Sequence, residues 1–266
     1  MNAIIIAAGR GKRLEHFTDN RPKCLVDIAG QSILDRQIAS YRAVGVDRIC
    51  VIRGYRAELL ERNGLEYRLN ANWPNNNILL SLSHAHDFMQ DDVLISYSDL
   101  VMTPESLRPL VEHDMASPFL LQVDTAYAEY YDGRSEHPIE EAESVIFDTE
   151  TMQVSEVGKK IPHKELTMGE FTGVWRVNED GCRLWRDGFD RAKAEHAGKP
   201  FGYAPVFEKS YLTDLMMMLI GEGAVFTASP GTQQVMEVDT TQDKARVEQI
   251  LAPKNAAEPI APRCKW

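Results

Sequence analysis

The chain has 266 residues, of which 44% are hydrophobic, and its formal net charge is −11 at pH 7. That hydrophobic content is enough for a buried core, so the composition excludes a disordered chain. The acidic balance excludes the broad basic surface that nucleic acids and anionic membranes require, so we expect neither as a partner. A small phosphate ligand would therefore depend on a few local cations and backbone amides.

The cysteines and the apolar segments indicate where in the cell the protein is expected. Cys24, Cys50, Cys182 and Cys264 are scattered, without a C-x-x-C pair or a histidine at metal-ligand spacing, so we predict no zinc site. The apolar run 3–8 is too short for a signal peptide, and no stretch approaches the roughly 20 apolar residues that span a bilayer. We expect a cytoplasmic protein with reduced thiols.

The first hundred residues alternate between strand and helix patterns. The β-branched run 3–8 predicts a strand buried on both faces, ended by Gly9. A helix is predicted over 32–44, with Gly45 where a C-terminal cap belongs. Further strands are predicted over 48–53, 66–69 and 92–97, and further helices over 57–63 and 78–88. The alternation predicts a doubly wound α/β unit with a mostly parallel sheet.

The pattern changes in the second half of the chain. Strands without long helices between them are predicted over 119–124, 144–148, 153–157 and 171–177. Helices over 179–195, 210–221 and 241–251 and a strand over 235–238 complete the prediction. We expect an antiparallel or mixed part here, followed by a loosely held tail over 252–266.

The strongest chemical signal is the segment Ala-Ala-Gly-Arg-Gly-Lys-Arg-Leu over 7–14, followed by Arg-Pro-Lys over 21–23. A Gly-x-Gly turn after a buried strand lets backbone amides approach a triphosphate, and the cations of Arg13 and Lys23 can offset its charge. By itself, Gly-x-Gly is equally well explained by a turn that needs glycine. The segment is neither a P-loop nor a dinucleotide fingerprint, because the glycine order differs from both.

Carboxylates follow two of the predicted strands. Asp99 comes after the strand over 92–97, at the edge where ligands of open α/β sheets bind. Glu237 and Asp239 alternate on a strand and therefore share a face. Carboxylates so placed can hold Mg²⁺ against a triphosphate. The alternatives are a helix cap or turn for Asp99 and an exposed edge-strand pair for Glu237 and Asp239.

The segment Ala-Ala-Gly-x-Gly-x-Arg-Leu with Pro-Lys shortly after it resembles the sugar-phosphate nucleotidyltransferase family. The resemblance implies a Rossmann-like α/β fold whose mixed part covers the acceptor. We expect one domain over 1–251, with a nucleotide-binding part over 1–115, an acceptor- and metal-binding part over 116–251, and a C-terminal tail over 252–266.

The resemblance also implies roles for single residues in phosphate and metal binding. Arg13 would contact the β and γ phosphates, and Lys23 would contact the α phosphate. The magnesium ligands would be Asp99, Glu237 and Asp239. The backbone that holds the triphosphate would be that of Ala7, Ala8, Gly9 and Gly11.

Further residues would contact the base and the acceptor. Asn77 and Ser81 lie four apart on one predicted helical face and would approach the nucleotide; a helix cap and a solvated serine are the alternatives. Lys159 would reach the acceptor phosphate, although a solvated charge explains it as well. Glu170 would accept a hydrogen bond from an acceptor hydroxyl or amine. The histidines have no assigned role.

Within the family, the sequence most resembles small cytidylyltransferases for non-sugar acceptors such as phosphocholine, 2-aminoethylphosphonate and glutamine phosphate. The segments that carry this likeness begin at Ile95, His137, Val157 and Met236. The likeness implies transfer of CMP from CTP to a small phosphorylated or phosphonate acceptor, with release of pyrophosphate, and a homodimer. The alternatives are a sugar-1-phosphate nucleotidyltransferase using UTP, dTTP, GTP or CTP, and a nucleotide-binding module without activity.

Overall fold

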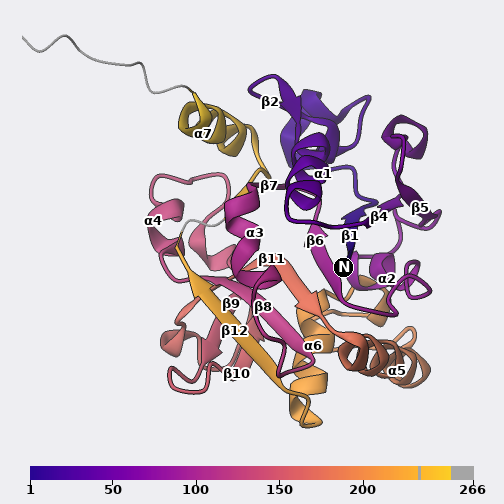
Figure 1. Ribbon diagram of the computed structural model, residues 1–266, viewed down its shortest axis with the longest axis vertical. Helices are drawn as coiled ribbons and strands as arrows, with labels where there is room; N and C mark the ends of the chain where they lie inside the picture. Colours follow the sequence, from indigo (N-terminus) through magenta and orange to yellow (C-terminus); the bar gives the residue numbers. More distant parts are fainter. Residues whose placement is uncertain (233–234, 253–266) are drawn as a thin grey trace, which may run out of the picture.

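A nine-stranded sheet forms the centre of the computed structural model, which describes residues 1–232 and 235–252 (Figure 1). Seven strands follow the order β10-β9-β11-β6-β1-β4-β5, while β8 and β12 extend from β11. The parallel part consists of β1 (Asn2–Ala7), β4 (Arg48–Arg53), β5 (Glu66–Leu69) and β6 (Val93–Tyr97). The order 6-1-4-5 places the carboxyl ends of β1 and β6 side by side, which is where ligands of open α/β sheets bind.

The mixed part of the sheet is organised around one long strand, β11. Its strands are β8 (Phe119–Asp124), β9 (Ser144–Phe147), β10 (Val154–Gly158), β11 (Gly169–Val177) and β12 (Phe226–Gly231). β11 pairs antiparallel with β6, β8 and β9, and its register on β8 shifts between Phe171 and Trp175. At this irregularity Gly173 has φ +82°, and a Cβ there would lie 2.5 Å from Tyr97 Cδ2. Only glycine therefore lets β11 bend past the Tyr97 ring.

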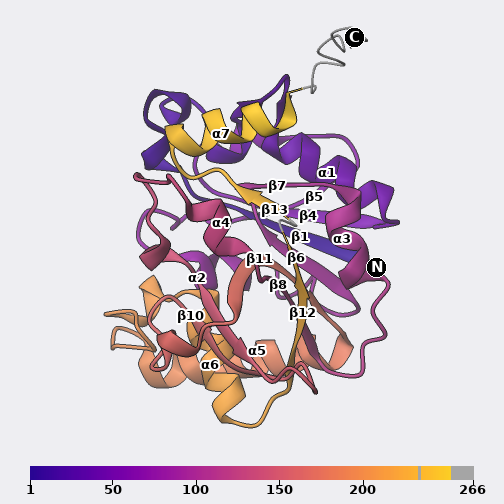
Figure 2. The same ribbon diagram turned by 90° about the vertical axis from the view of Figure 1, so that its left-hand side faces the viewer.

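Helices cover both faces of the sheet. One face carries α1 (Ile33–Ala43) and α3 (Pro104–Val111), and the other carries α2 (Ile78–Ser83), α5 (Glu179–His196) and α6 (Leu212–Gly221). Figure 2 shows the sheet between α1 above and α5 and α6 below. The side chains of β1 enter the two cores alternately, which explains why its apolar run is continuous.

A separate two-stranded sheet places residues near the end of the described chain beside the carboxyl end of β6. β7 (Leu100–Met102) pairs antiparallel with β13 (Val235–Glu237), so Glu237 lies opposite Leu100. The amide of Val238 then donates to the carbonyl of Asp99 at 2.9 Å. α7 (Thr241–Leu251) follows and packs through Val247 against Leu14 and Ile28. This pairing brings residues 99 and 237–239 together although they are far apart in sequence.

The remaining elements are short. They are the hairpin β2 (Asp27–Ile28) and β3 (Gln31–Ser32), helix α4 (Tyr127–Tyr131), and the 3-10 helices η1 (Lys12–Thr18), η2 (Lys23–Leu25), η3 (Ala57–Leu60), η4 (Ile139–Glu141), η5 (Lys164–Leu166) and η6 (Phe207–Lys209). Over the described residues, no helix is both long and apolar enough to cross a membrane. Cys24, Cys50 and Cys182 are buried free thiols.

The predicted fold class is confirmed, and several element boundaries are corrected. The strands predicted over 48–53 and 66–69 have those bounds, but the helix predicted over 57–63 is the 3-10 turn η3. The helix predicted over 78–88 ends at Ser83, and its last part forms hydrogen-bonded turns. β7, β12, α3 and α4 were not predicted. The tail predicted over 252–266 lies outside the described residues except for Ala252.

Two of the elements that were not predicted, α3 and β12, contain a proline, which disfavours helix and strand predictions. Pro109 lies inside α3, where a capping box of Thr103 and Ser106 and a proline in the first turn fix the start of the helix. Pro230 lies near the end of β12, which forms its ladder with β8; the bridge on its other side, from Thr227 to Gln153, stops before Pro230 among the described residues, so a residue without an amide hydrogen is tolerated there.

Candidate active site

A cavity of about 350 Å³ opens at the carboxyl ends of β1 and β6. The predicted site residues that line it are Ala8, Gly9, Gly11, Arg13, Lys23, Asn77, Ser81, Asp99, Lys159, Glu170, Glu237 and Asp239. The side chain of Ala7 does not reach the cavity, because it packs in the core beneath α1. The fold thus gathers residues from both halves of the chain around one space.

The two glycines of the turn after β1 differ in backbone conformation and in the space beside them. Gly11 has φ +76°, and a Cβ there would lie 2.6 Å from Cβ of Lys23, so this position both requires the left-handed backbone and leaves room for Lys23. A Cβ on Gly9 would meet no heavy atom within 4 Å among the described residues, its two chain neighbours aside. Gly9 borders the cavity, so the space beside its backbone is open to a ligand.

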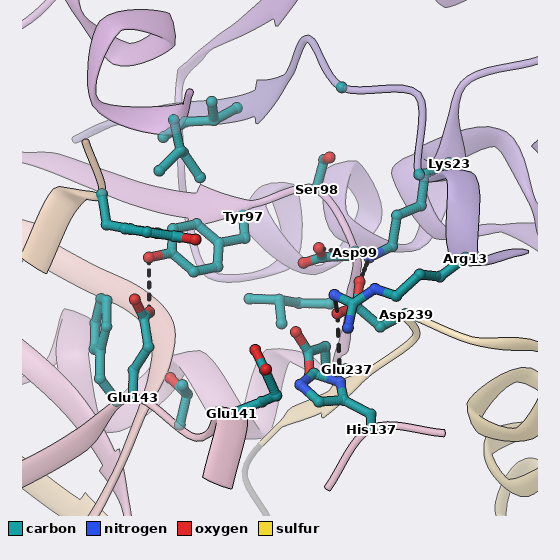
Figure 3. A pocket seen from close by; sticks show the side chains of 18 of the residues that line it. Arg13, Lys23, Tyr97, Ser98, Asp99, His137, Glu141, Glu143, Glu237 and Asp239 are labelled. Carbon is teal, nitrogen blue, oxygen red and sulfur yellow. Dashed lines mark hydrogen bonds and ion pairs between the residues drawn. The ribbon is translucent and has the colours of Figure 1, made fainter. Parts of the chain in front are cut away.

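Two cations from the loop after β1 meet the carboxylates that follow β6 and β13. The Lys23 ammonium lies 2.8 Å from Asp99 Oδ2 and also contacts Asp239, and Arg13 contacts Asp239 as well (Figure 3). Burial disfavours the charged form of Lys23, but the carboxylates of Asp239 and Asp99 outweigh it and raise the pKa of Lys23. Burial likewise opposes the ionised Asp239, yet Lys23 and Arg13 hold its pKa well below the ordinary value.

At this end of the cavity, the ligand atoms of His137, Glu237 and Asp239 lie within 4.8 Å of one another, close enough to hold one metal ion, and Asp99 borders the same space. Burial and the neighbouring charges of Asp239 and Asp99 raise the pKa of Glu237 well above its usual range, so a further cation beside these carboxylates would favour the ionised form of Glu237. Oδ1 of Asp99 is buried and accepts no hydrogen bond from the described residues. Unpaired carboxylate oxygens in such a cluster are the ligands that Mg²⁺ and Mn²⁺ prefer.

His137 and Arg134, which the sequence analysis gave no role, hold Glu237 in place. His137 Nδ1 lies 3.3 Å from Glu237 Oε2 and 3.4 Å from Asp239 Oδ2. Arg134 Nη2 lies 3.2 Å from Glu237 Oε2, and the same guanidinium binds Asp243 of α7 through both carboxylate oxygens. The only feature of the sequence that pointed to His137 was the segment that begins there, which carried part of the family resemblance; no feature pointed to Arg134.

The side of the cavity next to the start of α2 contains an amide network. Asn70 Nδ2 donates to Asn76 Oδ1 at 2.8 Å and to Ser81 Oγ at 2.9 Å, and Asn76 Nδ2 returns a bond to Asn70 Oδ1. The Asn77 side chain donates to the carbonyl of Lys209 at 3.0 Å. Asn77 and Ser81 border the cavity, and their side chains are also hydrogen-bonded within the protein, so their predicted contact with a nucleotide stays a prediction.

The opposite side of the cavity is rich in carboxylates and aromatic rings. Tyr97 Oη donates to Glu143 Oε2 at 2.9 Å, as Figure 3 shows, and Tyr131 Oη donates to Glu170 Oε1 at 2.6 Å. Burial raises the pKa of Glu143 and raises that of Glu170 to about 7. Lys159, predicted to bind the acceptor, lies 3.3 Å from Glu141 Oε2. On this side of the cavity the sequence predicted Lys159 and Glu170 as site residues, but not the lining residues Tyr97, Tyr131, Glu141 and Glu143.

Comparison with known proteins gives a family match over most of the chain. The family described as MobA-like NTP transferase domain matches residues 3–223. A CTP:phosphoglutamine cytidylyltransferase from Campylobacter jejuni is 27% identical over 189 residues, which cover 67% of this chain and 73% of that protein. A choline-phosphate cytidylyltransferase from Haemophilus influenzae is 35% identical over 106 residues, which cover 38% of this chain and 45% of the relative.

A solved structure shares the fold over nearly the whole length. The inositol-1-phosphate CTP transferase from T. maritima superposes with a TM-score of 0.70 and covers 94% of each chain, at 19% identity. At this identity the likeness concerns the fold alone.

Proposed function

This chain belongs to the family of MobA-like NTP transferase domains, and within that family we propose that it is a cytidylyltransferase. It transfers CMP from CTP to a small phosphorylated or phosphonate non-sugar acceptor and releases pyrophosphate. One observation carries the proposal: Lys23, from the loop after the glycine turn, is placed between Asp99 and Asp239 at the carboxyl end of β6. Cations and carboxylates so placed suit a triphosphate and its metal. The names of the curated relatives favour CTP.

The proposed reaction is a direct displacement at the α-phosphorus. An anionic oxygen of the acceptor forms a bond to that phosphorus, while the bond to the bridging oxygen breaks and its electron pair leaves on pyrophosphate. The acceptor phosphate is already largely ionised at pH 7, so the reaction needs no general base. Arg13 binds the β and γ phosphates, and Lys23 offsets the charge that develops around the α-phosphorus.

We further propose that Asp99, Glu237 and Asp239 hold Mg²⁺. The ion would supply electrostatic stabilisation of the departing pyrophosphate. His137 and Arg134 act on Glu237 rather than on the substrate, because their contacts fix the direction of its carboxylate. Asp99→Asn would keep the shape of the side chain and the fold while weakening Mg²⁺ binding and turnover. Unchanged Mg²⁺ affinity and turnover in this variant would remove Asp99 from the metal site.

The test of function is pyrophosphate release with Mg²⁺, with each of CTP, UTP, GTP and dTTP, and with a panel of acceptors. The panel contains phosphocholine, 2-aminoethylphosphonate, glutamine phosphate and several sugar 1-phosphates. Release that requires CTP and a non-sugar acceptor is the expected result. Release with a sugar 1-phosphate alone would assign the chain to the competing class of sugar-1-phosphate nucleotidyltransferases. Tight CTP binding without release from any acceptor would favour a nucleotide-binding module.

The oligomeric state is a separate part of the proposal. Resemblance to related enzymes favours a homodimer. Light scattering on the purified chain tests it directly, because a dimer has twice the mass of the 30.0 kDa chain.

A further inference from the structure

We infer that the acceptor carries an organic ammonium group, and that this group binds at the carboxylates of Glu143 and Glu170. The inference rests on the proposed function and names the class of acceptor. Glu170 pairs with Ser144 between β11 and β9, and the amide of Phe171 donates to the carbonyl of Glu143 at 2.8 Å. The two glutamates thus enter the cavity from neighbouring positions of paired strands.

Among the residues that the structure describes, neither carboxylate forms an ion pair within 4 Å; the charges of Lys159 near Glu143 and of Arg134 near Glu170 act from farther away and only partly oppose the rise in pKa that burial causes. Glu143 is 7% exposed and accepts hydrogen bonds from the hydroxyls of Tyr97 at 2.9 Å and Thr213 at 3.3 Å. Glu170 accepts one from Tyr131 at 2.6 Å. Hydroxyls satisfy some of the oxygen lone pairs, but they do not neutralise a buried negative charge. A cation in the cavity would do so.

The charges along the cavity are unequal at its two ends. At the end that holds Glu143 and Glu170, the side chain of Glu141 adds a further carboxylate, and the basic side chains nearby are Lys159 and Arg134, whose guanidinium lies 4.7 Å from the centre of the Tyr131 ring and is paired with Asp243. Lys159 is bound to Glu141 at 3.3 Å. The other end carries the cations Arg13 and Lys23 together with the carboxylates of Asp99, Glu237 and Asp239, and Figure 3 shows these residues apart from Tyr97 and Glu143. An acceptor with only a phosphate and hydroxyl groups would meet repulsion at the first end.

Aromatic rings line the same end as the two glutamates. Tyr97, Tyr131 and Phe171 border the cavity, and the rings of Tyr97 and Phe171 lie edge to face at 6.1 Å. Aromatic faces attract organic cations through the ring quadrupole, and they do so for primary and quaternary ammonium groups alike. Carboxylates and rings together therefore favour a zwitterion, with its phosphate or phosphonate toward Lys23 and its ammonium toward Glu143.

The first test compares two phosphonates that differ in this one group. With CTP and Mg²⁺, kcat/KM for 2-aminoethylphosphonate should exceed that for 2-hydroxyethylphosphonate by at least about tenfold, because the hydroxyl leaves both carboxylates without a cation. Equal or faster turnover of the hydroxyl compound, or turnover of sugar 1-phosphates alone, would overturn the inference while nucleotidyl transfer stands. Absence of pyrophosphate release with every acceptor would instead overturn the proposed function, and this inference with it.

The second test removes the charges one at a time. Glu143→Gln and Glu170→Gln keep the size of the side chain and an acceptor for the tyrosine hydroxyl, so the fold is expected to persist. Each should lower the preference for the amine over the hydroxyl compound by about tenfold, chiefly through KM for the amine. Glu165→Gln, on the exposed turn η5 outside the cavity, is the matched control and should keep the parental preference. A preference unchanged in both cavity variants would overturn the assignment.

Discussion

The ammonium of Lys23 lies 2.8 Å from Oδ2 of Asp99 and joins the loop after β1 to the end of β6. The same ammonium contacts Asp239, so the groups proposed to bind the triphosphate are paired with the groups proposed to bind its metal. Nucleotide and metal must therefore break the same ion pairs. Each ligand lowers the cost of binding the other, which predicts positive coupling between CTP and Mg²⁺.

Lys23→Met tests this coupling. Removing the ammonium frees the carboxylates of Asp99 and Asp239, so we expect Mg²⁺ to bind the free variant more tightly than it binds the parent. CTP turnover should nevertheless fall by about 10²-fold or more, because the charge near the α-phosphorus is no longer offset. Calorimetric titration with Mg²⁺, with and without CTP, measures both affinities. Weaker Mg²⁺ binding in the variant would contradict the shared use of these carboxylates.

The two glycines of the turn should respond differently to alanine. Gly11→Ala places a Cβ at a backbone with φ +76° and against Lys23, so we expect a loss of about 1 to 2 kcal/mol in the free energy of unfolding and reduced turnover. The added Cβ of Gly9→Ala meets no heavy atom within 4 Å in the described part of the chain beyond its neighbours in sequence, so the free energy of unfolding should stay within about 0.5 kcal/mol of the parent while CTP affinity falls. Urea unfolding and CTP titration separate the two effects. Parental CTP affinity in Gly9→Ala would place the triphosphate elsewhere.

The buried ion pair of Arg134 and Asp243 ties α7 to the active site. Asp243 is fully buried, and its carboxylate binds the guanidinium at 2.7 and 3.0 Å. Arg134→Met leaves that carboxylate without its partner, which should lower the free energy of unfolding by about 3 to 5 kcal/mol. Arg183→Met is the control, since Arg183 pairs with Asp180 on the surface of α5 and should change stability by no more than about 0.5 kcal/mol. Urea unfolding measures both, and similar losses in the two variants would be evidence against this anchor.

His86 should make stability depend on pH. Burial lowers its pKa from 6.5 to about 4, and its ring packs edge-on against Phe189 at 4.9 Å. Between these two pKa values the unfolded chain binds a proton that the folded chain does not, so stability falls as pH decreases from about 6.5 toward 4. The expected contribution is about 1 to 3 kcal/mol. His86→Phe should flatten thermal stability over this range, whereas His113→Phe, at an exposed histidine, should not; parallel pH profiles for parent and His86→Phe would refute the assignment.

Glu170 should make acceptor preference depend on pH. Burial raises its pKa to about 7, so its negative charge is lost as pH falls below that value. The ratio of kcat/KM for 2-aminoethylphosphonate over 2-hydroxyethylphosphonate should therefore rise from pH 6 to pH 8. Ionisation of the phosphonate is common to both compounds and largely cancels in the ratio. Glu170→Gln should give a flat ratio, and a slope that persists in this variant would assign the pH dependence to another group.

The sequence predicted the parallel half of the fold well because its signals are local. The run 3–8 is apolar throughout since both faces of β1 are covered, and Gly45 ends α1 with φ +84°. β12 and α3 were missed because each contains a proline that only the tertiary context makes acceptable, at a sheet edge in one case and in a capped short helix in the other.

Candidate site residues that directly follow strands could be predicted from the sequence. Residues that reach the cavity from loops could not, because only the folded chain brings them into contact. The residues Asp99, Glu237 and Asp239 do line one cavity, since β7 and β13 pair. Arg134, His137 and Glu143 come from loops between short elements, and no periodicity marks them. Their roles became visible only from their contacts with Glu237 and with Tyr97.

The most direct test of the central claim is to identify the products formed from CTP and 2-aminoethylphosphonate with Mg²⁺ by mass spectrometry. The account predicts a conjugate of CMP with the phosphonate and one pyrophosphate for each conjugate, and it predicts that Asp239→Asn lowers both together. Formation of free CMP, or of CDP with inorganic phosphate, without any conjugate from this or another acceptor, would contradict nucleotidyl transfer by this site.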